Sequence, residues 1–228
     1  MSIRTWSLCL VCGIVVSCAS TPVPQQKQVE MLADIDPFDV GVFTASCNKF
    51  FLTDIEEKVF TCKLVPRENT VEVGFLFQGC KFRWYLDSAD RAALIQAVSL
   101  YNADFTNKKL NKKGNKSAYG IIPVYVRWGL VTLNAEATVK LQVGYTFING
   151  APYFSIISPT TPEEKRDSSS GPVTKNTPVI ALYCTRAQAN ELATILSQEY
   201  LLEKLGEQNI PESLLPERQK ALSTPDVY

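Results

Sequence analysis

The middle of the chain alternates apolar and polar residues with a period of two. The alternation runs through residues 58–65, 71–77 and 80–86, and turn-forming residues lie between these runs at 66–69 and at Gln78-Gly79. A period of two is that of a β-strand with one buried and one solvated face. The pattern predicts an antiparallel meander with one apolar face, and residues 40–47 fit a further strand before it.

The period changes after the third of these runs. Apolar residues then recur at helical spacing, at Leu94, Val98, Tyr101 and Phe105. The segment 88–105 therefore predicts an amphipathic helix, with Asp87 or Ser88 as its N-cap and Asp90 in its first turn.

The second half of the chain repeats this organisation. Strands are expected at 121–133, 137–148, 153–157 and 179–183, and Asn149-Gly150 is a strong hairpin signal between two of them. Pro123 places the beginning of its strand at an edge. Thr185 with Gln188 three residues later forms a capping-box pattern, which begins a second helix that ends near Gly206.

These elements predict an α+β fold, a mostly antiparallel β-sheet with two amphipathic helices packed on one face. Two similar sheet-helix halves are one interpretation, because the residues from Thr70 to Gly79 have echoes from Thr138 to Gly150. Any two amphipathic hairpins share Val, Gly and Phe at such places, so duplication and chance both fit. We expect a single domain at 37–206 and a proline-containing C-terminal tail at 207–228.

One long connection interrupts the second half. Residues 158–178 are rich in Pro, Ser and Thr, and they include Ser168-Ser169-Ser170-Gly171. Such a segment buries little apolar surface, so we expect an exposed loop.

The amino end has the features of an export signal. Arg4 is its basic end, residues 8–16 are mostly apolar, and small residues follow. The apolar run is shorter than the ~20 residues that a membrane-spanning helix needs. We therefore expect residues 1–17 to be a signal peptide and the chain not to span a membrane.

The sequence Val15-Val16-Ser17-Cys18 resembles the lipobox of bacterial lipoproteins. This resemblance implies that Cys18 is acylated, for example with palmitate, and becomes the mature N-terminus in a lipid bilayer. Residues 18–36 would then be a flexible tether, and Ala19 favours the outer membrane by analogy with Gram-negative lipoproteins. An ordinary secretory signal, cut near Ala19, is the alternative.

Composition excludes several kinds of chemistry. The chain has no histidine, so it lacks the usual general base, the usual zinc ligand and the Ser-His or Cys-His nucleophile pairs. Its 23 basic and 23 acidic residues balance, which gives no reason to expect nucleic acid as a partner. We predict no enzyme, no metal and no cofactor. The acidic pairs Asp87/Asp90, Glu56/Glu57 and Glu163/Glu164 are expected to be cap or loop charges.

The expected domain contains four cysteines, Cys47, Cys62, Cys80 and Cys184. An even number in an exported domain permits two disulfides. Cys62 and Cys80 also lie on the apolar faces of their strands, so buried core thiols fit equally well. The sequence leaves both alternatives open.

Two other groups of residues are candidates for binding. A basic loop carries Lys108, Lys109, Lys112, Lys113 and Lys116, and it fits either an anionic partner or a solvated loop. Aromatic residues in the expected strands would line a cavity or fill the core: Trp84, Trp128, Tyr145, Phe147 and Tyr153.

Together these features predict a lipid-anchored envelope protein with a non-catalytic binding or structural role and an envelope or surface protein as partner. A carrier of an apolar small molecule in a curved β-sheet is the alternative. An enzyme with an Asp, Lys or Cys centre is the third hypothesis, and no inward polar strand residue supports it.

Overall fold

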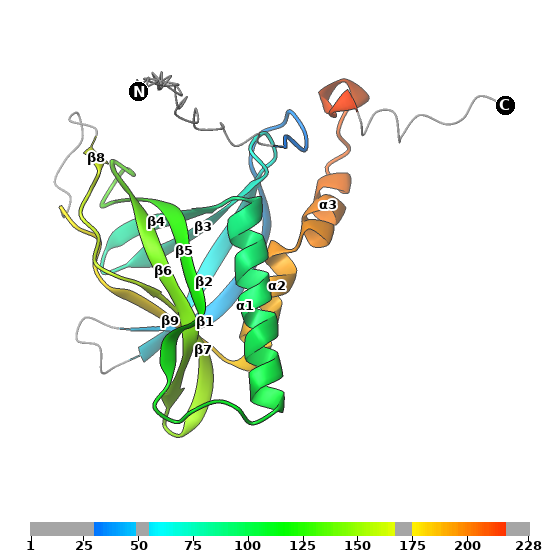
Figure 1. Cartoon of the computed structure of the whole chain (residues 1–228). Helices are drawn as coiled ribbons and strands as arrows, with labels where there is room; N and C mark the ends of the chain where they lie inside the picture. The colour runs from blue at the N-terminus through cyan, green and yellow to red at the C-terminus, as the bar shows by residue number, and fades with distance from the viewer. Residues whose placement is uncertain (1–29, 49–54, 167–174, 218–228) are drawn as a thin grey trace, which may run out of the picture.

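The computed structural model describes residues 30–48, 55–166 and 175–217 (Figure 1). The strands of the first half are β1 (Phe38–Asn48), β2 (Ile55–Val65), β3 (Thr70–Phe77) and β4 (Cys80–Leu86). Those of the second half are β5 (Asn115–Gly129), β6 (Ala135–Ile148), β7 (Ala151–Ser158), β8 (Lys165–Arg166) and β9 (Ile180–Cys184). Helix α1 (Ser88–Thr106) joins the halves, and α2 (Arg186–Leu196), α3 (Gln198–Gly206) and a 3₁₀ turn (Glu212–Leu214) follow.

Eight of these strands form a closed antiparallel barrel. Each of β1 to β6 pairs with the next strand in the sequence, β7 pairs with β9, and β9 returns to β1. The β1–β9 ladder is short, since only Ser46↔Tyr183 and Cys47↔Leu182 are paired. By contrast, β5 and β6 pair from Trp128↔Ala135 to Gly120↔Val143. β8 adds only a short ladder at the beginning of β6.

The apolar face of the sheet lies inside the barrel. Alternate residues of every long strand are buried, as the period of two predicts. Aromatic rings meet across neighbouring strands: Phe75 lies 5.0 Å from Phe60, 5.5 Å from Phe82 and 5.3 Å from Trp84, measured between ring centroids. A barrel of eight strands is just wide enough for side chains to fill it or to hold one small ligand. Here Trp128, with no exposed surface, and these rings occupy the interior.

Two tight hairpins set the register of adjacent strands. Gln78-Gly79 joins β3 to β4 and Asn149-Gly150 joins β6 to β7, and all four residues have positive φ. Positive φ at both central residues is the type I′ geometry, whose twist matches that of the flanking strands. The hairpin predicted at Asn149-Gly150 is confirmed.

The helix starts are also as predicted. Asp87 caps α1 and forms a capping box with Asp90, and Thr185 caps α2 and forms one with Gln188. The second expected helix, however, is two helices. Ser197 has an extended backbone, ends α2, and caps α3 by accepting a hydrogen bond from the Tyr200 backbone amide.

The predicted α+β class, with two helices on one face of an open sheet, is wrong. The pairing of β9 with β1 and of β5 with β6 closes the sheet, so its apolar face encloses a core of its own and both halves contribute to one ring. The helices lie side by side next to the barrel (Figure 1). Tyr101 of α1 donates to the Pro152 carbonyl, and Tyr200 of α3 donates to the Val40 carbonyl. The helices are therefore held to the wall at β7 and β1.

The segments flanking the barrel are partly ordered. The end of the expected tether packs on the domain, with Leu32 and Ala33 buried and the Asp34 amide donating to the Leu214 carbonyl. The first part of the expected tail thus contacts the segment before β1. The domain therefore begins before residue 37 and extends past 206. Likewise, part of the predicted loop 158–178 is paired, through β8 and the bridge Pro162↔Asn176.

Candidate binding groove

An open groove lies on the outer face of the barrel. It has a volume of about 1110 Å³ and is formed by β2, β3, β4, the end of β5 and the β5–β6 connection. Apolar and cationic side chains share its lining, which includes Lys58, Val59, Thr61, Gly74, Phe75, Leu76, Lys81, Phe82, Arg83, Arg127, Val131, Thr132, Leu133 and Asn134.

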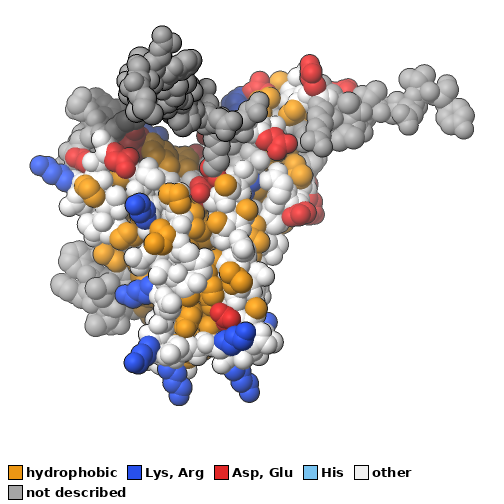
Figure 2. All heavy atoms as spheres, viewed as in Figure 1, with side chains coloured by type: hydrophobic (Ala, Val, Ile, Leu, Met, Phe, Trp, Pro, Cys, Tyr) orange, Lys and Arg blue, Asp and Glu red, His pale blue; other side chains and the backbone are white. Residues whose placement is uncertain are grey.

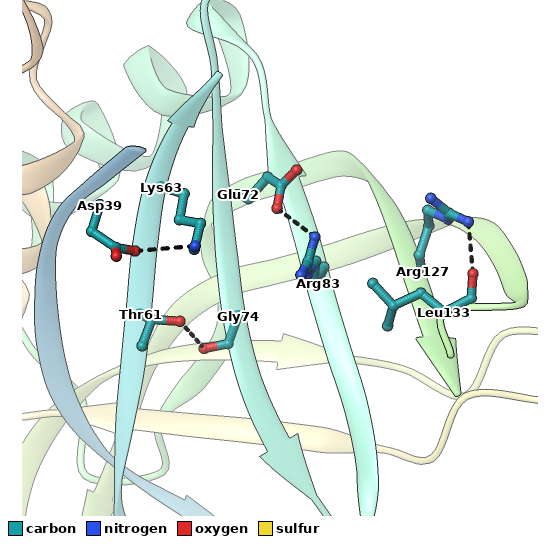
Figure 3. Close-up of polar contacts among 8 residues, drawn as sticks. All are labelled: Asp39, Thr61, Lys63, Glu72, Gly74, Arg83, Arg127 and Leu133. Atoms are coloured by element: carbon teal, nitrogen blue, oxygen red, sulfur yellow. Dashed lines mark hydrogen bonds and ion pairs between the residues drawn. The ribbon is translucent and has the colours of Figure 1, made fainter. Parts of the chain in front are cut away.

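The groove deepens where β2 and β3 separate. Their ladder runs from Val65↔Thr70 to Thr61↔Gly74 and ends there, although both strands continue. The Thr61 hydroxyl donates to the Gly74 carbonyl at this last pair, at 3.1 Å (Figure 3). Beyond it, Phe75 and Phe82 of the interior contribute to the lining. The groove therefore reaches from the outer surface to core aromatic rings.

Three exposed aliphatic side chains make the rim apolar. The exposed fractions are 59% for Val59, 61% for Leu76 and 79% for Val131. Scattered exposed aliphatic residues are ordinary, but these three line one concavity. The rim can therefore take up an apolar group from water.

Four cations line the same groove, and only two have acidic partners. Arg83 pairs with Glu72 at 2.9 Å (Figure 3), and Lys58 pairs with Glu56 at 2.6 Å. None of the ion pairs between described residues involves Lys81 or Arg127. Lys81 donates to the Val131 carbonyl at 3.2 Å, and Arg127 donates to the Leu133 carbonyl at 2.7 Å.

Two glycines allow this local geometry. A Cβ on Gly129 would lie 1.7 Å from the Thr132 backbone oxygen, so only glycine lets the β5–β6 connection fold back this tightly. A Cβ on Gly74 would lie 2.9 Å from the Thr61 hydroxyl, and its absence leaves the groove floor open between Thr61 and Arg83.

A second, smaller hollow of about 600 Å³ adjoins the groove and shares Arg127 with it. Tyr85 and Tyr125 lie there with ring centroids 5.4 Å apart. The Tyr125 hydroxyl donates to Glu136; burial, and then this bond, raise the pKa of Tyr125 to about 12. The hollow also contains Asp87, which is engaged as the cap of α1. Asp87 and Asp90 are therefore cap residues of α1, as the sequence predicted for this pair.

The predicted lysine loop, residues 108–116, has all five of its lysines exposed. Lys108 and Lys109 follow α1, Lys112 and Lys113 lie in the turn before β5, and Lys116 lies in β5. Figure 2 shows Lys and Arg side chains gathered at the lower end of the molecule, where α1 ends in Figure 1. None of these five lysines lines the groove.

The four cysteines of the domain are buried free thiols in the structure. Burial raises the pKa of Cys47, Cys62 and Cys184 to about 12 in each case, and it also raises that of Cys80. A thiol is nucleophilic only as its thiolate, so these groups are unreactive near neutral pH. Of the two alternatives that the sequence left open, the structure has the buried core thiols.

The other predicted candidates have structural roles. Trp84, Trp128 and Tyr145 are buried, and Phe147 packs against the core. The carboxylate of Glu164 accepts a hydrogen bond from the Thr138 amide. The Glu56/Glu57 pair lies in β2, where a loop was expected.

Within the described ranges, no group of acids and cysteines could hold a metal ion, and no helix is long and apolar enough to cross a bilayer.

Comparison with known proteins places the chain in a bacterial family. Residues 38–203 match a family described as "Uncharacterised Treponema protein". The chain belongs to this family. It is also similar to an uncharacterized protein of Treponema pallidum (strain Nichols), with 26% identity over 201 residues, which cover 86% of this chain and 69% of the relative. No solved structure matches the chain. The matched region spans the barrel and extends into α3.

The sequence patterns did not single out the groove residues. Lys81 and Arg83 alternate with apolar residues along β4, which places them on the outer face. Their partners in the groove come from β2, β5 and the β5–β6 connection. The only sequence signal is an outward-facing basic residue on each of two strands, Arg83 and Arg127. This signal gives no information about which strands pair.

Cys18, the predicted acylation site, lies outside the described residues.

Proposed function

We propose that this protein is a non-catalytic binding protein of the bacterial envelope, which takes up an amphipathic small molecule with an anionic end in the outer groove. The observation that carries this proposal is the joint lining of the groove. Exposed aliphatic side chains border a concavity in which Lys81 and Arg127 form no ion pair with any described residue. Ligand sites are typically concave and largely apolar, with a few polar groups that fix orientation.

This proposal moves the carrier hypothesis from the inside of the sheet to its outer face. The interior is filled by contacting aromatic rings, so a ligand there would have to displace side chains such as Trp128. A ligand in the groove needs no such displacement. It would contact the interior only at Phe75 and Phe82.

The absence of catalysis is part of the proposal. The chain lacks histidine, and the thiols of the domain are held in their neutral form by burial. The carboxylates Glu56 and Glu72 beside the groove each pair with a cation. These observations support binding over acid-base or nucleophilic chemistry.

Extraction of the purified protein tests the binding role. The full chain carrying Cys18→Ser, purified without detergent, is denatured in organic solvent and its extract is measured by mass spectrometry. We expect an amphipathic molecule in an amount comparable to that of the protein. The control is the same chain with Leu76→Asp, which adds a charge to the rim and should lose the molecule. Equal recovery from both chains would contradict a site in the groove.

We further propose that Cys18 carries the lipid anchor, in the outer membrane, and that the lysine loop meets an acidic envelope partner. The anchor is tested by feeding cells labelled palmitate and comparing the wild type with Cys18→Ser. Label in the wild type alone would support acylation at Cys18. Equal labelling of both chains, or of neither, would exclude it. Pull-down with a chain in which the five loop lysines are Gln tests the partner.

A further inference from the structure

We infer that the ligand of the groove is a long-chain fatty acid, with its carboxylate at Arg127 and Lys81 and its tail along Leu76 toward the gap between β2 and β3. This inference rests on the proposed function and specifies the chemistry of the ligand. Two features of the groove support it: an unbalanced pair of arginines and one apolar path into the barrel wall.

The first feature is the position of the two arginines. Arg83 and Arg127 are directly opposite on β4 and β5, and like charges in this arrangement repel. Glu72 compensates Arg83, whereas no ion pair between described residues compensates Arg127. Glu136, opposite Arg127 on β6, accepts the hydroxyl of Tyr125. An anion in the groove would relieve the repulsion.

The guanidinium of Arg127 also has hydrogen-bonding capacity in reserve. It has five N–H donors, of which one is used by the Leu133 carbonyl, and its Nε is buried without a partner. A carboxylate binds a guanidinium through two parallel hydrogen bonds, a geometry that a neutral hydroxyl does not reproduce. The Lys81 ammonium, which is anchored on Val131 of the same connection, adds a second positive charge to this part of the groove.

The second feature is a single apolar path. Leu76 and Val59 lie on β3 and β2 where these strands no longer pair, and Phe75 lines the groove at the same level. One acyl chain can follow this path, and each methylene that leaves water strengthens binding by about fourfold. A lipid with two chains would need a second path, and a choline or ethanolamine headgroup would bring a cation to Arg83 and Arg127.

Competition between matched ligands tests the inference. The full chain carrying Cys18→Ser is titrated with hexadecanoate, hexadecanol and lysophosphatidylcholine at about neutral pH, by displacement of a fluorescent polyene fatty acid. We expect hexadecanoate to bind about tenfold or more tightly than hexadecanol, since a charge-assisted pair is lost with the alcohol. Thermal unfolding of each variant, followed by circular dichroism, establishes that it is folded.

Two variants separate the head from the tail. Arg127→Gln should weaken hexadecanoate by about tenfold and leave hexadecanol unchanged, and Arg127→Lys should recover part of the loss. Leu76→Asp should weaken both ligands. The matched controls are Lys63→Gln, a cation of β2 paired with Asp39, and Ile121→Asp, an exposed residue of β5, and neither residue lines the groove.

The outcomes distinguish this inference from the proposed function. Three results would overturn the inference that the ligand is a fatty acid but keep the groove as a binding site. They are equal binding of hexadecanoate and hexadecanol, unchanged hexadecanoate binding by Arg127→Gln, and tighter binding of lysophosphatidylcholine than of hexadecanoate. Failure of every amphiphile to bind would remove the proposed function as well.

Discussion

Alternate residues of the same strands face the packed interior of the barrel and the groove on its outer surface. Along β3, Phe75 points into the core, while its neighbours Gly74 and Leu76 line the outer groove. The interior rings contact one another and have almost no exposed surface. The side chains on the groove rim, Val59, Leu76 and Val131, are by contrast exposed. We therefore expect interior substitutions to change the free energy of unfolding and groove substitutions to change ligand affinity.

The largest effect should follow removal of the largest interior side chain. Trp128→Ala should lower the free energy of unfolding by about 3–5 kcal/mol, because it deletes a fully buried ring and leaves a cavity. Urea unfolding followed by circular dichroism measures this. Leu76→Ala is the matched change in the groove and should stay within about 0.5 kcal/mol of the wild type. Similar losses in both would contradict the division of the wall into two faces.

Arg91 and Arg127, two arginines that form no ion pair with another described residue, extend the comparison. Arg91 of α1 is buried, and burial lowers its pKa; it donates to the Asn69 side chain at 2.8 Å and to Gln198 of α3 at 2.7 Å. Arg91→Met should cost about 2–4 kcal/mol, because several buried acceptors lose a charged donor. Arg127→Met should cost less than about 0.5 kcal/mol, since one carbonyl alone loses its donor and returns to water. Urea unfolding measures both variants. A larger loss of unfolding free energy for Arg127→Met than for Arg91→Met would show that Arg127, and not Arg91, is the structural arginine.

Alkaline pH should weaken the interior of the barrel. The thiols of Cys47, Cys62 and Cys184 have pKa values of about 12 in the folded protein, against 9.0 for an ordinary thiol. The folded state therefore keeps protons that the unfolded chain releases. Stability is fully present below pH 9 and falls as pH rises toward 12, by at most about 1.4 kcal/mol per pH unit for each thiol.

Unfolding in urea at several pH values, with Cys184→Ala as the comparison, measures this slope. The variant should start from lower stability and lose less of it between pH 9 and 11, because one proton-linked group is gone. An identical slope would show that Cys184 does not titrate differently on unfolding. Alkylation of the native protein near neutral pH should be slow for all four buried cysteines.

The smallest change in stability should come from the groove rim. Val131→Asp should alter the free energy of unfolding by less than about 0.5 kcal/mol, because 79% of the side chain is exposed. The same change should weaken ligand binding several-fold, since it removes apolar contact and repels an anionic head. A variant that unfolds, or that binds as well as the wild type, would place Val131 outside the site.

Much of the local structure followed from the sequence. The alternation at 58–86 located β2 to β4, Asn149-Gly150 located a hairpin, and the Thr185–Gln188 capping box located the beginning of α2. These features depend on neighbouring residues, so the sequence contains them directly. The groove could not be predicted in this way, because its residues are distant in the sequence. Arg83 and Arg127 become neighbours only when β4 and β5 pair.

The sequence by itself determined which residues alternate, where the chain turns and where the helices begin, since backbone geometry and short-range hydrogen bonds set these features. Only the tertiary structure decided that the sheet closes. The pairing of β1 with β9 joins residues more than a hundred positions apart, and no local pattern specifies it. That closure turned the expected open face into a filled interior and left the proposed binding groove on the outside of the wall.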